Sequence, residues 1–544
     1  MLVLRGTVRT GNEAYGDVTA LAVRDGRIVA VGAEAEALAA TADEVLDLGA
    51  EGLLMPSFGD GHAHPLFGGL EHFGPQIKEL GSVDEIVAEV GRWAAAHPVA
   101  EHPEEEWIVG ASYDPALVPD GEFDARWLDA AVPDRPVVLR AYDYHTVWCN
   151  TEALRRAGVD KATPEPRLGW IVRRPDGTPM GTLREWHACD LVLDRVPGRP
   201  VTELVDAIRV AGEAYARAGL TWVQDAWVEP EMVDAYLRAA RDGALRFRVN
   251  LAQRADPDRW REQRPAFAEQ RRRVEAEGGE LLTARTVKFF SDGVIEGGTA
   301  ALLEPYDDAP HSCGMPVWEP AALAEAVRAF DADGFQIHIH AIGDAGVRAA
   351  LDAIESAARA NGEWDRRPVI THVQLVDPAD LPRFAELGVV ANFEPLWAQP
   401  DPLQTVLSVP RIGEKRAALQ YPMGDLAHGG ARLSFGSDWP VSSYEPLEGI
   451  QVAVTRRTFD GAPGADGWLP RQRMTVEQAL GAYTAGSAHQ AFADERAAGL
   501  VPGAPADLVW LSADPRTTDP MRLREIRVLG TWLAGEPTFD RDHE

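Results

Sequence analysis

Eight short apolar segments, most of them separated by amphipathic helical stretches, constrain the fold of this chain more than any other feature. The helical stretches 201–218, 231–242, 321–332 and 344–361 carry apolar residues three and four positions apart. Strands that alternate with helices in this way are typical of an α/β fold, a (β/α)8 TIM-like barrel. The predicted strands are 53–59, 220–225, 247–252, 286–291, 335–340, 369–372, 389–393 and 433–436.

Strand-like segments also occur at both ends of the chain. Residues 2–4, 18–23 and 27–32 are apolar or alternate between glycine-rich turns, and 507–511, 526–530 and 531–536 have the same character. Because chain termini often lie close together, we expect residues 1–56 and 490–544 to form one small β-sandwich domain. The barrel would then span residues 57–489.

A long insertion, about residues 66–200, separates the first predicted barrel strand from the helix before the second. It contains a predicted helix at 83–96 and an extra strand at 137–141. An insertion after the carboxyl end of a barrel strand lies over the active-site face, so we predict a cap that shapes the substrate pocket. A peripheral decoration is the alternative.

The charge balance excludes some partners. The 544 residues include 85 Asp and Glu but only 53 Lys and Arg, which gives a formal net charge of −32. A surface this acidic repels phosphate groups, so we expect neither nucleic acid nor an anionic membrane as a partner. No apolar run approaches the ~20 residues of a membrane helix, and the first residues lack a signal-peptide pattern. We therefore expect a soluble, cytoplasmic protein.

The motif Asp60-Gly61-His62-Ala63-His64 directly follows an apolar segment. Side chains two positions apart on a strand point to the same face, so both histidines can approach one ion. Imidazole nitrogen binds zinc and similar divalent metals. At the carboxyl end of a first barrel strand, the pair predicts a metal site.

Later strand ends offer further ligands. His340 ends the fifth strand and lies nearer the mouth than His338, so we predict that His340 is a ligand and His338 a packing or hydrogen-bonded partner. His372 ends the sixth strand, and Asp438 follows the eighth. Four strand ends that each offer a histidine or an aspartate favour a metal centre over four unrelated core residues.

Lys288 stands inside the apolar strand 286–291 and is one of only four lysines in the chain. A buried, unpaired ammonium group is costly, so its pKa falls or it finds a partner. A neutral lysine amine can take up carbon dioxide and become a carbamate, an anionic ligand that bridges two metals. A lysine that pairs with a core carboxylate or extends to the mouth is the alternative.

These motifs, in this order, resemble the metal-dependent amidohydrolase superfamily, and within it amidohydrolase family 3, which includes N-substituted formamide deformylases. The resemblance covers nearly the whole chain. Besides the Asp60–His64 motif, it rests on segments 107–110, 143–150, 287–293, 338–344, 435–441 and 498–508.

The resemblance implies two divalent metal ions, expected to be Zn²⁺. The more buried ion would be bound by His62, His64 and Asp438. Lys288, as a carbamate, would bridge to the second ion, which His340 and His372 would complete. His145 falls where the family has a histidine in the inserted segment and would contact the substrate. A homodimer is also implied.

Two positions depart from the family pattern. The family more often has Glu before the sixth-strand histidine, whereas Thr371 precedes His372 here, so a carboxylate beside this ligand is missing. Gly61 stands where a small apolar residue is commoner, and we expect little consequence.

The ligand set predicts a hydrolase that cleaves a carbon–nitrogen bond, other than a peptide bond, in a small amide or N-substituted formamide. Two cations that share a hydroxide lower the pKa of the bound water toward ~7. Asp438 would take the proton of the attacking hydroxide and return it to the leaving nitrogen, and His145 would donate to the oxyanion. The alternatives are an ester or lactone hydrolase, a mononuclear deaminase-like enzyme with unmodified Lys288, and a non-catalytic scaffold.

Tryptophans near several strand ends predict an aromatic rim at the active-site mouth, which would favour a substrate with an apolar or aromatic substituent. Packing of the cap against the barrel is the alternative role for these rings. The residues concerned are Trp227, Trp318, Trp397 and Trp439.

Overall fold

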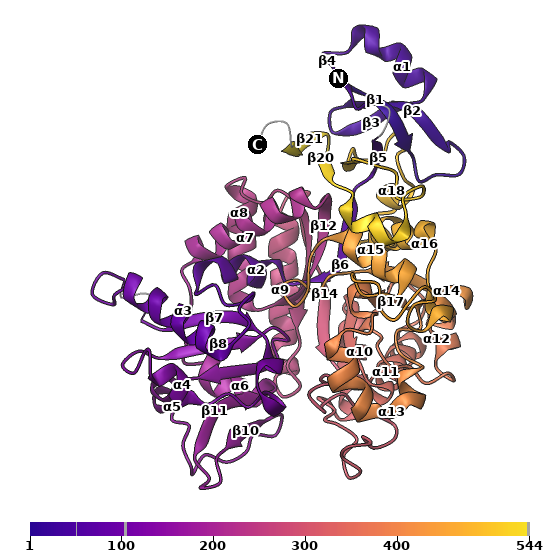
Figure 1. Ribbon diagram of the computed structural model, residues 1–544. Helices are drawn as coiled ribbons and strands as arrows, with labels where there is room; N and C mark the ends of the chain where they lie inside the picture. The colour runs from indigo at the N-terminus through magenta and orange to yellow at the C-terminus, as the bar shows by residue number, and fades with distance from the viewer. Residues whose placement is uncertain (50–51, 103–105, 541–544) are drawn as a thin grey trace. The chain divides into compact units, whose positions relative to one another are not determined.

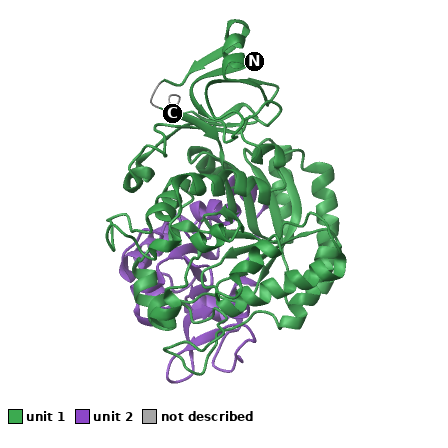
Figure 2. Cartoon of the chain, turned by 90° about the vertical axis from the view of Figure 1, so that its right-hand side faces the viewer, with its two compact units in different colours: residues 1–64, 208–439, 443–544 green, residues 65–207, 440–442 purple. Residues whose placement is uncertain are grey.

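The computed structural model describes residues 1–49, 52–102 and 106–540. The chain divides into two compact units (Figure 2). Unit 1 consists of residues 1–64, 208–439 and 443–544, and unit 2 consists of residues 65–207 and 440–442.

Unit 1 contains a parallel eight-stranded sheet that curls into a nearly closed barrel (Figure 1). The carbonyl oxygen of His62 in the first strand accepts hydrogen bonds from the backbone N–H groups of Ser437 (3.2 Å) and Asp438 (2.7 Å), which follow the last strand. These bonds join the two edges. The strands, in their order around the sheet, are β6 (Phe58–Ala63), β12 (Leu220–Val228), β13 (Arg248–Arg254), β14 (Leu282–Phe290), β15 (Gln336–Ala341), β16 (Val369–His372), β17 (Val390–Phe393) and β18 (Arg432–Phe435).

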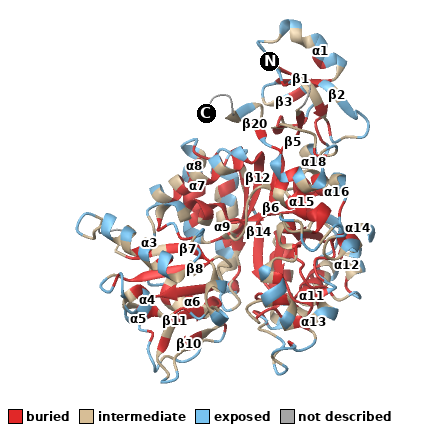
Figure 3. Ribbon diagram, viewed as in Figure 1, coloured by how far each residue is buried: buried red, intermediate tan, exposed pale blue. Residues whose placement is uncertain are grey.

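Helices separate most barrel strands, as the apolar spacing predicts. On the helix after β15, residues Val347, Leu351 and Ile354 are buried three and four positions apart. Figure 3 shows the same division, with buried strands and helices that are exposed on one side. The larger helices of unit 1 are α8 (Pro230–Arg241), α9 (Trp260–Glu277), α10 (Pro320–Ala332), α11 (Asp344–Asn361), α12 (Leu381–Glu386), α13 (Val409–Ala417), α14 (Met423–His428), α15 (Pro446–Thr455) and α16 (Val476–Gly481). Helix α7 (Val201–Arg217) runs from unit 2 into unit 1.

The prediction for the first barrel strand, 53–59, is wrong in its bounds. Residues Leu53–Pro56 form β5, which pairs with strands from the two ends of the chain, whereas the barrel strand β6 begins at Phe58. The sequence pattern does not reveal this change of sheet, because the neighbouring apolar residues of both strands are buried. As a result Asp60 and His62 lie within β6, and His64 lies just beyond its end.

The two ends of the chain form one mixed sheet. Its order is β21-β20-β19-β5-β1-β2-β3, and β4 pairs with β1. Helix α1 (Ala33–Leu38) packs on one face through Ala35. In the described residues the strands form one continuous hydrogen-bonded path, and the two-layer packing of a sandwich stays a prediction. Its strands are β1 (Leu2–Arg9), β2 (Asp17–Arg24), β3 (Arg27–Val31), β4 (Glu44–Asp47), β5, β19 (Leu508–Leu511), β20 (Val528–Leu533) and β21 (Glu536–Asp540).

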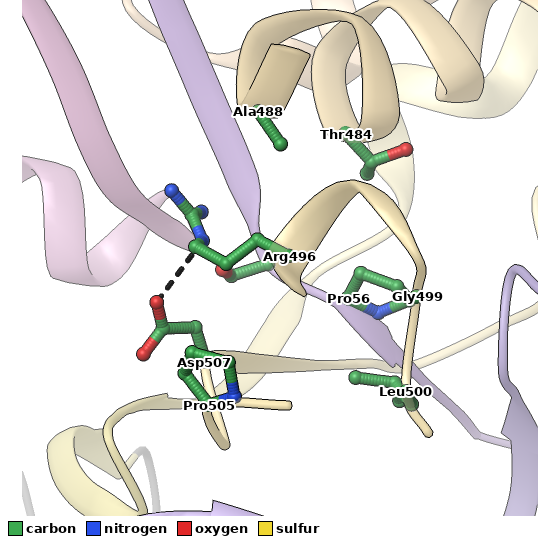
Figure 4. A pocket seen from close by; sticks show the side chains of 9 residues that line it. Pro56, Thr484, Ala488, Arg496, Gly499, Leu500, Pro505 and Asp507 are labelled. Atoms are coloured by element: carbon green, nitrogen blue, oxygen red, sulfur yellow. Dashed lines mark ion pairs between the residues drawn. The ribbon is translucent and has the colours of Figure 1, made fainter. Parts of the chain in front are cut away.

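A buried carboxylate links the terminal sheet to the barrel. Asp507 forms ion pairs with Arg248 (3.0 Å), in β13, and with Arg496 (3.1 Å). Figure 4 shows the Arg496–Asp507 pair beside a small pocket that is also lined by Pro56 and Leu500. Asp507 thus neutralises charge where two sheets of unit 1 meet.

Unit 2 contains a five-stranded sheet and short helices. The predicted helix at 83–96 and strand at 137–141 are both present with those bounds. The sheet order is β10 (Trp170–Arg173), β11 (Pro179–Arg184), β9 (Thr146–Cys149), β8 (Val137–Ala141) and β7 (Ile108–Tyr113). The helices of this unit include α2 (Pro65–Leu70), α3 (Val83–Ala96), α4 (Ala125–Asp129), α5 (Thr151–Ala157) and α6 (Trp186–Leu193).

Across the described ranges, no helix combines the length and the apolar character that crossing a membrane requires.

Candidate metal centre

All six predicted ligands lie in unit 1, at or near the carboxyl ends of barrel strands, and all six are buried. Their positions follow from parallel pairing, which brings the carboxyl ends of the strands to one end of the barrel. In register, Phe290 lies opposite His340, and His340 lies opposite Thr371. The six residues are His62, His64, Lys288, His340, His372 and Asp438.

Three of these side chains already have the geometry of a metal site. One ligand atom from each of His62, His372 and Asp438 lies within 4.8 Å of the others. Nε2 of His62 is 3.2 Å from Oδ1 of Asp438, and Nε2 of His64 is 2.9 Å from the same oxygen. Two or three imidazoles and a carboxylate suit zinc and similar divalent ions.

The protonation states also suit a cation. Burial, and then the nearby Lys288 amine, lower the pKa of His62 well below its ordinary value, so this imidazole is neutral and can bind a metal. Burial by itself raises the pKa of Asp438, but the hydrogen bond from His64 and the positive charges nearby lower it by more. Asp438 therefore remains a carboxylate.

Lys288 is fully buried, as its position in an apolar strand predicts. Within the described part of the chain its Nζ atom has no hydrogen-bond partner, and it lies 4.7 Å from the centre of the Phe290 ring. Burial lowers the pKa of the amine to about 7, and the carboxylates of Asp438 and Glu394 oppose this shift. An amine with a lowered pKa and no partner among the described residues fits a group that takes up carbon dioxide and binds a metal.

His340 lies beside this cluster but outside the three-residue group. Its ring centre is 4.5 Å from that of His372, whereas its Nε2 atom is 3.1 Å from the carbonyl oxygen of Gly293. A ligand role for His340 stays a prediction. His338 contacts His62, since Nε2 of His338 is 2.8 Å from Nδ1 of His62. This is the hydrogen-bonded position that the sequence predicts for the deeper histidine.

The backbone is strained at two of the ligands. His372 has φ = 72° and Asp438 has φ = 55°, in the left-handed region that non-glycine residues rarely adopt. Such strain persists only where the surroundings impose it, and it concentrates at functional sites. His372 ends β16 and Asp438 follows β18, so the turns at these strand ends aim their side chains at the cluster.

The sequence does not predict a role for Glu394, a buried residue beside the ligands. Glu394, which directly follows β17, accepts a hydrogen bond from Nδ1 of His372 (2.8 Å). Thr371 Oγ1 lies 3.1 Å from the other oxygen of Glu394. The signal that could have revealed Glu394 is the one used for Asp438, an acidic residue at the end of an apolar strand.

The four predicted rim tryptophans have different surroundings. Trp397 stacks on His372, with ring centres 5.2 Å apart and planes at 4°, and the Trp227 ring lies 6.2 Å from that of His64. Trp318 and Trp439 are buried, the first against Phe289 and the second between tyrosines. Trp318 and Trp439 therefore pack within unit 1, and substrate contact stays a prediction for all four tryptophans.

His145 lies in unit 2, where it forms a pair with a buried carboxylate. Nδ1 of His145 is 2.8 Å from Oε2 of Glu185, and the backbone N–H of Glu185 donates to the carbonyl oxygen of His145 (2.7 Å). Glu185 has φ = 62° and ψ = 172°, a strained conformation for a residue with a side chain. Glu185 therefore orients the imidazole through both its backbone and its side chain.

Comparison with known proteins places the chain in a family. A family model described as the amidohydrolase family matches residues 44–539. The protein LONG AFTER FAR-RED 3 of Arabidopsis thaliana is 31% identical over 530 residues, which cover 94% of this chain and 87% of that protein. The N-substituted formamide deformylase of Arthrobacter pascens is 27% identical over 559 residues, which cover 99% of this chain and 98% of that protein. The crystal structure of an uncharacterized metal-dependent hydrolase from Pyrococcus furiosus has a TM-score of 0.72 at 25% identity, over 95% of this chain and 100% of that one. This chain therefore belongs to the amidohydrolase family.

Proposed function

We propose that this protein is a metal-dependent hydrolase that cleaves a carbon–nitrogen bond in a small amide or N-substituted formamide. The observation that carries the proposal is the cluster of His62, His372 and Asp438 beside the buried amine of Lys288, which has no hydrogen-bond partner among the described residues. Membership of the amidohydrolase family supports an enzyme that acts on carbon–nitrogen bonds. The likeness to an N-substituted formamide deformylase supports that substrate class.

Each residue has a defined task in this proposal. Bound divalent cations, expected to be Zn²⁺, would polarise the substrate carbonyl and make a water molecule more acidic. Asp438 Oδ1 would accept a proton from the attacking water and return it to the leaving nitrogen. The neutral Lys288 amine would add to carbon dioxide and lose one proton, which leaves an anionic carbamate to hold a second ion.

Residues outside the ligand set would contact the substrate. Glu185 accepts a hydrogen bond from Nδ1 of His145, so the imidazolium form of His145, with a proton on both ring nitrogens, would donate from Nε2 to the developing oxyanion. The aromatic faces of Trp227 and Trp397, beside the ligands, favour a substrate with an apolar or aromatic substituent. We further propose a cytoplasmic enzyme that forms a homodimer.

A mononuclear centre is the second candidate, and the contact of His340 Nε2 with the Gly293 carbonyl favours it. The metal content of the purified protein separates the two arrangements. About two ions per chain, together with a carbamate on Lys288, support the binuclear enzyme, and one ion with an unmodified amine supports the mononuclear one.

The function is tested by a hydrolysis panel of N-substituted formamides, acylamides, esters and lactones, measured with the wild type and Asp438→Asn. We expect formamide or amide hydrolysis that falls about 10²- to 10⁴-fold in the variant. Undiminished activity of Asp438→Asn would remove the proton-transfer role. A metal-loaded wild type that hydrolyses nothing in the panel would favour the scaffold alternative.

A further inference from the structure

Glu394 is a completely buried carboxylate that contacts a candidate metal ligand. It follows strand β17, and its Oε2 atom is 2.8 Å from Nδ1 of His372. A buried carboxylate is costly unless its oxygens are bonded. Both oxygens have a partner, since Thr371 Oγ1 lies 3.1 Å from Oε1.

The contact with Nδ1 decides which nitrogen of His372 can bind a metal. When Nδ1 carries the proton and donates it to Glu394, the lone pair of the neutral ring is on Nε2. The stacked Trp397 ring restricts the plane of the imidazole at the same time. Carboxylates that bond to a metal-binding histidine in this way fix its tautomer and make it a stronger ligand.

A polar network fixes Glu394 in turn. The Thr371 hydroxyl lies 2.8 Å from Oδ1 of Asn392, and Nδ2 of Asn392 donates to Ser434 (2.9 Å). A Cβ atom on Gly61 would lie 2.4 Å from Nδ2 of Asn392, so the glycine leaves the room that Asn392 occupies. Gly61 thus has more consequence than the sequence indicates, because Gly61 and Thr371 meet at the same asparagine.

We propose that Glu394 is the positioning residue of His372. Held by the Thr371–Asn392 pair, it supplies from the neighbouring strand the carboxylate that the segment around His372 lacks, and it directs Nε2 of His372 toward the metal. This inference rests on the proposed function, since it requires that the centre binds a divalent cation.

The test measures metal affinity without any substrate. Metal-free wild type, Glu394→Gln and a control are titrated with Zn²⁺ against a chromophoric chelator, and the visible spectrum of Co²⁺-loaded protein reports the ligand geometry. Glu394→Gln preserves the shape of the side chain but removes its charge. We expect its affinity to fall about 10- to 100-fold, with an altered Co²⁺ spectrum.

The control is Asp331→Asn on α10. Asp331 is 2% exposed and binds Arg366 (3.0 Å), so it matches Glu394 in burial but lies on a helix away from the ligands. We expect its metal affinity to remain within about twofold of the wild type, as expected for a change that touches no ligand. Equal losses in both variants would overturn the proposal, because the effect would then be one of general destabilisation.

A rescue variant tests the position of the charge. Thr371, on β16, and His372 contact the same carboxylate group of Glu394. Thr371→Glu combined with Glu394→Gln can therefore supply a carboxylate to Nδ1 of His372 from β16 in place of the one that follows β17. Thermal unfolding first shows whether this double variant is folded. We expect the folded double variant to bind Zn²⁺ at least tenfold more tightly than Glu394→Gln does. No recovery in the folded protein would overturn the proposal, as would wild-type affinity in Glu394→Gln. A wild type that binds no Zn²⁺ would instead reject the proposed function itself.

Discussion

Nε2 of His62 and Oδ1 of Asp438 lie 3.2 Å apart, although the two residues belong to the first barrel strand and to the turn after the last. The backbone repeats this link, because Asp438 N–H donates to the carbonyl oxygen of His62 (2.7 Å). The candidate metal centre therefore lies on the seam where the barrel closes. An ion bound there would join the two edges of the sheet as well as serve the chemistry.

Metal binding should accordingly stabilise the fold. A ligand at 100 times its dissociation constant adds about 2.7 kcal/mol to the free energy of unfolding. We expect Tm to rise when Zn²⁺ is added to chelator-treated protein, and His62→Ala to lose most of that rise. The matched control is His489→Ala, outside the cluster, which should keep the response. Equal responses of both variants, measured by differential scanning calorimetry, would contradict a site at the seam.

Replacing Lys288 should have opposite effects on stability and metal binding. Lys288→Met removes a buried amine that has no hydrogen-bond partner in the described part of the chain, so the metal-free protein should gain about 1–3 kcal/mol in unfolding free energy. The same variant should bind fewer ions per chain, because Met cannot form a carbamate. Urea unfolding measures the free energy of unfolding, and metal analysis measures the number of ions per chain. Lys415→Met, at an exposed position, should change neither quantity. A metal-free Lys288→Met that is less stable than the wild type would contradict the inference that the Lys288 amine destabilises the metal-free fold.

Loss of the Glu185 charge should impair turnover but not metal content. Glu185→Gln removes the carboxylate that orients His145, so we expect kcat for amide hydrolysis to fall about tenfold or more. Glu152→Gln, which removes the charge that pairs with Arg155 and Arg156 on α5, serves as the control. A loss of bound metal in Glu185→Gln that matches the loss of activity would show that its effect is not on His145.

A methyl group at Gly61 should be costly. The added carbon of Gly61→Ala would lie 2.4 Å from Nδ2 of Asn392, and such overpacking costs about 1–3 kcal/mol. In an Asn392→Ala background the cost should fall, which is a direct test of their contact. Gly481→Ala, where a Cβ atom meets nothing within 4 Å, should be neutral or slightly stabilising. Equal costs of Gly61→Ala in the two backgrounds would exclude Asn392 as the main source of the clash, because Gln490 Oε1 (2.9 Å) and the Phe435 carbonyl oxygen (3.1 Å) also lie close to the added carbon.

Glu445 should make stability fall with rising pH. Burial, and then Glu448, raise the pKa of its carboxyl group to about 7 in the folded state, above the value of about 4.3 for an exposed glutamate. The folded state therefore binds more protons between these two pKa values, so stability is lost as pH rises through this range. Glu445→Gln should flatten the decline and be more stable than the wild type at pH 8. Parallel stability curves from urea unfolding at pH 5 to 8 would refute this.

Local patterns in the sequence predict most of the barrel and the chemistry of its ligands. The spacing of apolar residues gives the helices, and seven barrel strands fall within a few residues of their predicted bounds. The His62–His64 spacing and the place of Lys288 in an apolar strand identify ligand types, because strand geometry and burial depend on nearby residues. The prediction of the first barrel strand fails at Ser57, because one apolar segment contributes strands to two different sheets.

The sequence by itself determined which chemical groups this protein can bring to a metal, since His62, Lys288, His372 and Asp438 each mark the end or the interior of a strand. Only the tertiary structure decided how those groups are held. Glu394 on Nδ1 of His372 and Asn392 in the space beside Gly61 are contacts between different strands. Such contacts depend on the register and curvature of the sheet, which no single segment encodes.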